Sequence, residues 1–125
     1  YVKNGFVDYG NGKFYPNLDK VYCNKIINPN SIESFKKNID LINKTKIPFI
    51  FIRLPETKQY YLSVNNNQFD SLIHKFGLYY NLNDFLNLND TFHFIDDNHL
   101  NNTGVKVANE YIINKILKNN SDKIK

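Results

Sequence analysis

Hydrophobic residues recur at helical spacing over residues 30–46, which predicts an amphipathic helix. The apolar positions lie three or four residues apart: Ile32, Phe35, Ile39 and Ile42. At this spacing the side chains fall on one face of a helix. Asn30 and Glu33 at the start have the form of a capping box, in which each side chain bonds a backbone N–H at the helix end.

Two short apolar runs predict strands, with a second helix between them. The run Phe49 to Ile52 has no polar position, which is typical of a strand buried on both faces in a parallel sheet. A second strand is expected over Leu78 to Leu82. The helical stripe between the strands is made of Phe69, Leu72, Ile73 and Phe76. Gly77 then supplies a residue that tolerates the left-handed backbone at a helix end.

A final helix is predicted over residues 102–118, after an extended segment over Thr91 to Ile95. Its buried stripe is expected to be Val105, Ala108, Ile112 and Ile116. The order helix, strand, helix, strand, loop, helix indicates right-handed βαβ units. We therefore expect an α/β fold: a small three-layer parallel-sheet domain resembling half of a flavodoxin-like fold.

The predicted α/β portion spans residues 30–118, and residues 119–125 are expected to form a frayed tail. Residues 1–29 are expected to be a hairpin or irregular extension of the same domain. Two short aromatic runs flank Asn11-Gly12, a pair that tolerates the positive φ angles of a tight hairpin turn. The alternative for Asn11 is a loop side chain that points at a ligand, as part of a substrate-binding site.

Composition excludes several classes of function. The 125 residues carry a net charge of +4 but a single arginine, Arg53. Specific readers of phosphate and guanine favour arginine, so no nucleic-acid partner is expected. No apolar run approaches the length that a membrane span needs. Cys23 is the only cysteine, so neither an internal disulfide nor a thiolate metal site is expected.

The stretch from Asp96 to Gly104 carries the chemistry that the sequence offers. It follows the last predicted sheet segment and precedes the final helix, where ligands bind in open α/β sheets. Asp96, three residues before His99, can accept a hydrogen bond from the imidazole Nδ1–H and leave Nε2 to take a proton. The alternative is structural: His99 caps the helix and Asp96 bonds loop amides. A metal site of His93, Asp96 and His99 is not expected, because His93 and Asp96 would face opposite sides of an extended segment.

This block resembles the Asp-x-x-His motif, followed by Leu-Asn and Gly, that ends the SGNH (GDSL-type) hydrolase superfamily. Residues 46–55 are similar to a core strand of such proteins, which often ends in a proline, and the resemblance covers roughly residues 31–118. It implies that His99 is the general base that activates a serine and that Asp96 orients it; Asp97 has the wrong spacing. It implies no cofactor, and its substrate would be an acyl ester or an acylated carbohydrate.

The chain departs from the family where the nucleophile should be. None of the five glycines begins a Gly-Asp-Ser motif, and the Gly-x-Asn-Asp block is missing as well. Ser71 follows Asp70 inside a predicted helix and is interpreted as a surface serine. The chain therefore looks like the C-terminal half of an SGNH-like serine esterase or O-acyltransferase domain, whose serine lies outside it. A missing N-terminal half, or a second copy, would dock at the open sheet edge. The compartment stays open between the bacterial cell envelope and the cytoplasm.

Other residues leave two alternatives each. Arg53 ends a predicted strand and can either contact an anionic substrate group or pair with Glu56 or Asp96 to hold the loop. Tyr60 and Tyr61 can line an acyl or sugar pocket, or simply pack over the sheet. The alternative for the whole chain is a non-catalytic α/β module that docks onto another domain or chain.

Overall fold

A computed structural model describes residues 10–17, 19–20 and 27–123. Its elements follow in this order: α1 (Pro29–Thr45), β1 (Phe51–Arg53), α2 (Lys58–Leu62), α3 (Asn66–His74), β2 (Tyr79–Asn81), a 3₁₀ turn (Leu82–Asp84), α4 (Asp90–His93), α5 (Asn102–Tyr111), a π-helical segment (Ile112–Leu117) and a last 3₁₀ turn (Ser121–Lys123). Strands β1 and β2 pair in parallel, with Ile52 opposite Tyr80. The prediction of a small α/β domain with parallel strands is confirmed.

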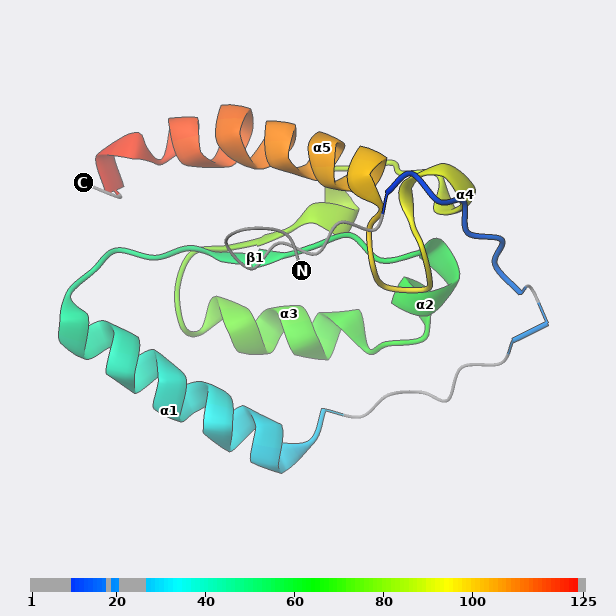
Figure 1. Ribbon diagram of the computed structural model, residues 1–125. Helices are drawn as coiled ribbons and strands as arrows, with labels where there is room; N and C mark the ends of the chain where they lie inside the picture. Colours follow the sequence, from blue (N-terminus) through cyan, green and yellow to red (C-terminus); the bar gives the residue numbers. More distant parts are fainter. Residues whose placement is uncertain (1–9, 18, 21–26, 124–125) are drawn as a thin grey trace.

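The two strands separate helices that lie on opposite sides (Figure 1). Side chains alternate along β1: Phe51 contacts Phe35 of α1, with ring centroids 5.6 Å apart, whereas Ile52 packs against the core under α5. The residues of β1 are only partly buried, so the predicted burial on both faces is wrong. The reason is that β2 is the one strand paired with β1 among the described residues.

Helix α1 begins at Pro29, two residues earlier than the capping-box pattern at Asn30 indicated. The cap is Asn28, whose Oδ1 accepts from the backbone N of Asn30 at 2.9 Å. Pro29 occupies the first helical position, where its missing N–H costs nothing. Ile39 is buried, but Ile42 is 37% exposed, so the buried stripe does not include the last predicted position.

The segment from Asp90 to His93 is a short helix, so the predicted extended conformation is wrong there. Asn89 Oδ1 accepts from the backbone N of Thr91 and of Phe92, at 3.0 and 3.1 Å. A side chain that satisfies these N–H groups favours a helical turn over a strand. Only Phe94 remains extended, in a single antiparallel bridge with Leu100.

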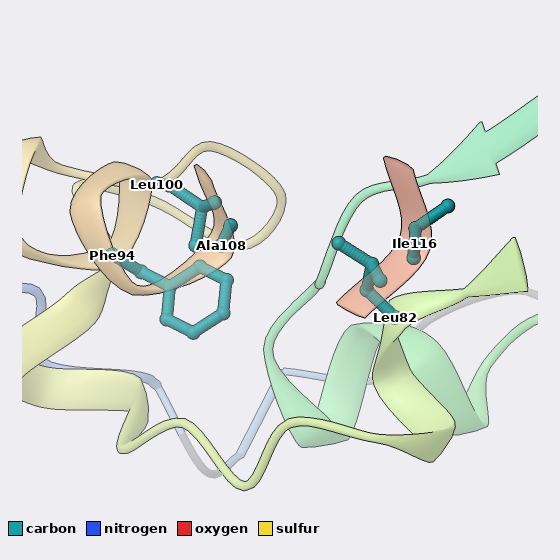
Figure 2. Packing of buried hydrophobic residues seen from close by; sticks show 5 residues of the cluster. All are labelled: Leu82, Phe94, Leu100, Ala108 and Ile116. Atoms are coloured by element: carbon teal, nitrogen blue, oxygen red, sulfur yellow. The ribbon is translucent and has the colours of Figure 1, made fainter. Parts of the chain in front are cut away.

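The core lies between the last helical region and strands β1 and β2, whose residues Ile52 and Tyr80 pack against it. Figure 2 shows its buried members: Leu82, Phe94, Leu100, Ala108 and Ile116. Ala108 and Ile116 belong to the stripe predicted for the last helix, and its other members, Val105 and Ile112, pack against the cluster while partly exposed. The prediction for this helix face is therefore confirmed, although residues 112–117 are π-helical rather than α-helical.

Both ends of the described chain contribute to this packing. Asn120 is buried, and its Nδ2 donates to Tyr80 Oη at 2.9 Å, so the packed region extends beyond residue 118. The first strand of the expected hairpin falls in residues 1–9, outside the described residues. Residues 12–17 belong to no helix or strand, but Phe14 N donates to Thr91 O at 3.0 Å.

Within the described ranges, no helix is long and apolar enough to cross a membrane.

Gly104 permits the close contact between α4 and α5. A Cβ there would clash with the backbone oxygen of His93 and lie 2.9 Å from Leu100 Cδ2. We expect Gly104→Ala to lower the free energy of unfolding by about 1–3 kcal/mol, because the backbone cannot yield as a side chain would. Urea unfolding followed by circular dichroism measures this. Gly12→Ala is the control, because a Cβ there meets nothing within 4 Å. A Gly104→Ala variant more stable than the parent would contradict this packing.

Candidate active site

Asp96 and His99 are in contact in the loop between α4 and α5. Asp96 Oδ2 lies 2.9 Å and Oδ1 3.0 Å from His99 Nδ1. This is the contact expected from the spacing of the two residues. Their side chains are 48% and 56% exposed, so the pair faces the surface rather than the core. With Nδ1 held by the carboxylate, Nε2 is the ring nitrogen that can accept a proton.

Asp96 also orders the loop around itself. Its Oδ1 accepts from the backbone N–H groups of Asn98 and His99, at 3.0 and 2.8 Å. Burial alone would raise the pKa of Asp96, but the bonds from the Asn98 backbone and from the His99 ring and backbone outweigh it. The pKa of this carboxyl is therefore lowered from its usual value.

Thr57, the residue before α2, holds the same loop from below. Thr57 is fully buried, and both its backbone N and its Oγ1 donate to Asp97 O, at 3.0 and 2.8 Å. The Asp97 carboxylate forms a salt bridge with Lys20. Asp97 thus contacts Lys20 and Thr57, whereas Asp96 contacts Nδ1 of His99. This agrees with the expectation that Asp97 has the wrong spacing to orient the imidazole.

Asn101 anchors the other end of the loop and caps α5. Its side chain accepts from Gly104 N at 3.0 Å and donates to the backbone oxygens of Gly12 and Phe92, each at 2.8 Å. The capping alternative is therefore wrong for His99, because Asn101 is the cap. It is right that Asp96 bonds loop amides, which it does while also holding the imidazole.

A small cavity of about 190 Å³ opens beside His99. Its walls are mainly apolar and include Leu54, Pro55, Leu100 and Val105. Such a lining suits a short acyl group better than a charged one. Leu54 and Pro55 reach this point because they directly follow β1, which places the carboxyl end of a parallel strand next to the imidazole.

Arg53 pairs with its neighbours, as one of the two alternatives expected. Nη2 lies 2.6 Å from Glu56 Oε2, and Nη1 lies 3.0 Å from Asn66 Oδ1 and 3.5 Å from Asp70 Oδ1. The side chain is 10% exposed. Burial alone would lower the pKa of Arg53, but the hydrogen bond and charge of Glu56 raise it above its ordinary value. Arg53 therefore stabilises the ends of the strands.

Asn11, far from the candidate pair in the sequence, contacts the first turn of α5. Its Oδ1 accepts from Thr103 Oγ1 at 3.2 Å, and Gly10 O accepts from Asn102 N at 2.9 Å. Asn11 does not line the cavity beside His99. Asn11 therefore joins the N-terminal segment to α5, and the predicted role in substrate binding finds no support at this cavity.

Among the described residues, the other candidates, Ser71 and His93, make no contact with the Asp96 or His99 side chain. Ser71 is exposed on α3, as interpreted from the sequence. His93 Nδ1 accepts from the backbone N of Asn89 at 3.0 Å. Across the described ranges, no three His, Cys, Asp or Glu side chains gather as a metal site would require.

A polar network at the ends of the strands was missed in the sequence. Asn81 Nδ2 donates to Asp70 Oδ2 at 3.1 Å and to Tyr61 Oη at 2.9 Å, and Tyr79 Oη donates to Asp70 Oδ1 at 2.7 Å. Burial, followed by this bond to Asp70, raises the pKa of Tyr79. The available signal was a pair of asparagines at the second predicted strand: Asn81 near its end and Asn83 directly after it.

Comparison of the chain with protein-family models, with curated proteins and with solved structures found no match.

The lowered pKa of Asp96 gives a test of the pair. A depressed carboxyl pKa stabilises the folded loop above the unfolded value of about 3.9, and this stabilisation is lost as pH falls through the folded pKa. We expect the ¹³Cγ signal of Asp96 to titrate with a midpoint below about 3.9. The midpoint should rise in His99→Ala, which removes the ring hydrogen bond, and stay in place in His74→Ala. An Asp96 midpoint that His99→Ala leaves unmoved would contradict the contact.

Proposed function

We propose that this chain carries the base-bearing half of an SGNH-like serine esterase or O-acyltransferase, with the serine supplied from outside this sequence. The observation that carries the proposal is the 2.9 Å contact between Asp96 Oδ2 and His99 Nδ1. It lies beyond the carboxyl end of a parallel strand, in a loop fixed by buried Thr57 and Asn101. A carboxylate that orients an imidazole is the arrangement that activates a hydroxyl nucleophile.

The proposed reaction uses His99 as general base and then as general acid. The serine Oγ attacks the ester carbonyl while its proton passes to His99 Nε2, and Asp96 stabilises the imidazolium that forms. When the tetrahedral intermediate collapses, the C–O bond to the alcohol breaks and Nε2 returns the proton to that oxygen. Water or an acceptor alcohol then attacks the acyl-serine, again losing its proton to His99, which finally returns it to the serine oxygen.

The proposal also specifies the fold that would complete the site. Helices on both sides of the strands support a three-layer, flavodoxin-like half (Figure 1). On this proposal the missing N-terminal half, or a second copy, adds strands at the outer edge of β1. That part would bring the serine and the oxyanion donors, and the substrate would be an acyl ester or acylated carbohydrate.

A non-catalytic docking module is the second candidate, and a specific observation favours it. Leu100 is buried, Asn101 is the helix cap and Gly104 permits a close backbone contact, so folding alone accounts for much of the Asp96–Gly104 block. Ile113 and Leu117 are also exposed on the last helical segment, as a docking surface would require. Only the role of His99 separates the two candidates.

Hydrolysis of 4-nitrophenyl acetate by the full-length protein tests the catalytic proposal. We expect His99→Ala to lower kcat/KM by about 10³-fold or more, because no other group takes the proton. Asp96→Asn should lower it by about 10²–10⁴-fold, since the imidazole loses its orienting carboxylate. His74→Ala, an exposed histidine on α3, is the matched control and should retain activity. Activity that His99→Ala leaves unchanged would reject His99 as the general base and with it the catalytic proposal, and a parent protein without activity would favour the docking module.

A further inference from the structure

A second, larger depression adjoins the cavity beside His99. Its volume is about 480 Å³, and Pro55 lines both hollows. The segment from Leu54 to Glu56 runs between them, with Leu54 on the side of His99 and Glu56 on the side of the larger depression. A molecule that occupied both would cross Pro55.

The wall of this depression is polar and held in place by hydrogen bonds. Asn83 Oδ1 accepts from Glu56 N at 2.8 Å, and its Nδ2 donates to Asn81 Oδ1 at 2.9 Å. Both carboxylate oxygens of Asp90 accept from Lys58 N at 3.3 Å. These bonds join the segment after β1 to the end of β2 and its following 3₁₀ turn, and α2 to α4, so the wall is ordered before any ligand arrives.

Other lining groups are available to a ligand. Within the described ranges, the side-chain amide of Asn87 and the ammonium of Lys58 make no hydrogen bond. Glu56 Oε2 is taken by Arg53, which leaves Oε1 to accept. The hollow therefore offers separate donors and acceptors to a bound molecule.

The charges exclude two classes of ligand. Glu56 and Asp90 line the hollow, and the charges of Lys58 and of the Arg53 that pairs with Glu56 only balance them, so no excess positive charge attracts an anion. Both carboxylates already accept charged or backbone donors, which makes them poor ligands for a bare cation. Pro55, Leu86 and Leu88 add apolar wall to a lining whose other members are mostly polar. A neutral molecule with many hydroxyl groups satisfies such a lining best.

We propose that this depression binds a carbohydrate. Sugar hydroxyls both donate and accept, so one sugar can bond the Asn87 amide, the Lys58 ammonium and the free Glu56 oxygen together. Tyr61 also lines the hollow, and its ring is held by the Arg53 guanidinium, 4.9 Å from the ring centroid. The link to the acyl cavity rests on the proposed function: the sugar would carry the ester across Pro55 to His99. The binding itself does not depend on catalysis.

Titration of the full ¹⁵N-labelled chain with saccharides tests the inference. The probes are cellotetraose, xylotetraose and chitotetraose, with sodium phosphate and calcium chloride as the competing classes. At least one saccharide should shift the side-chain amide signals of Asn83, Asn87 and Asn89. Asn87→Ala and Lys58→Ala should each weaken its binding about fivefold, the effect of one hydrogen bond. Asn114→Ala, an exposed asparagine on the last helix, is the matched control and should bind as the parent does.

Three results would overturn the carbohydrate site. They are the absence of a saccharide response at these signals, a response to phosphate or calcium in place of saccharide, and saccharide binding unchanged in both Asn87→Ala and Lys58→Ala. His99→Ala should bind the saccharide with the affinity of the parent chain. Failure of the ester assay would therefore remove the proposed function while this titration still decided the carbohydrate site.

Discussion

The buried side chain of Asn101 is the interaction on which the position of the candidate active site depends. Asn101 is 1% exposed, and its amide joins the segment at Gly12, the end of α4 at Phe92 and the start of α5 at Gly104. Leaving these groups unpaired in the interior would cost far more than the net gain of an ordinary hydrogen bond. These bonds therefore hold the three segments together in the observed arrangement. His99, two residues earlier, is placed by that arrangement.

The loop combines fixed ends with an accessible pair. Thr57 holds Asp97 O from one side, and Ile95 N bonds His99 O across the loop at 3.0 Å. The Asp96 and His99 side chains nevertheless remain about half exposed. A functional group gains precision when buried neighbours fix its backbone, while a substrate needs the group itself to be reachable. In this loop, buried Thr57 and Asn101 fix the backbone, and the Asp96 and His99 side chains stay accessible.

Local features were predictable from the sequence, and features that join distant segments were not. The Asp96–His99 and Arg53–Glu56 contacts span three residues each, so spacing alone indicated them. Periodicity likewise predicted the buried positions of Ala108 and Ile116. The extended segment was predicted wrongly because the Asn89 cap outweighs the apolar pattern that follows it. The bond from Glu56 N to Asn83 crosses 27 residues, and nothing in either residue's surroundings in the sequence indicates its partner.

The central claim is that Asp96 fixes the imidazole of His99 so that Nε2 is the basic nitrogen. Long-range ¹H–¹⁵N correlation of the histidine rings, at a pH where they are neutral, measures this directly. Asp96 can only accept from Nδ1, so His99 should be the Nδ1–H tautomer. A His99 ring protonated at Nε2 would contradict the account.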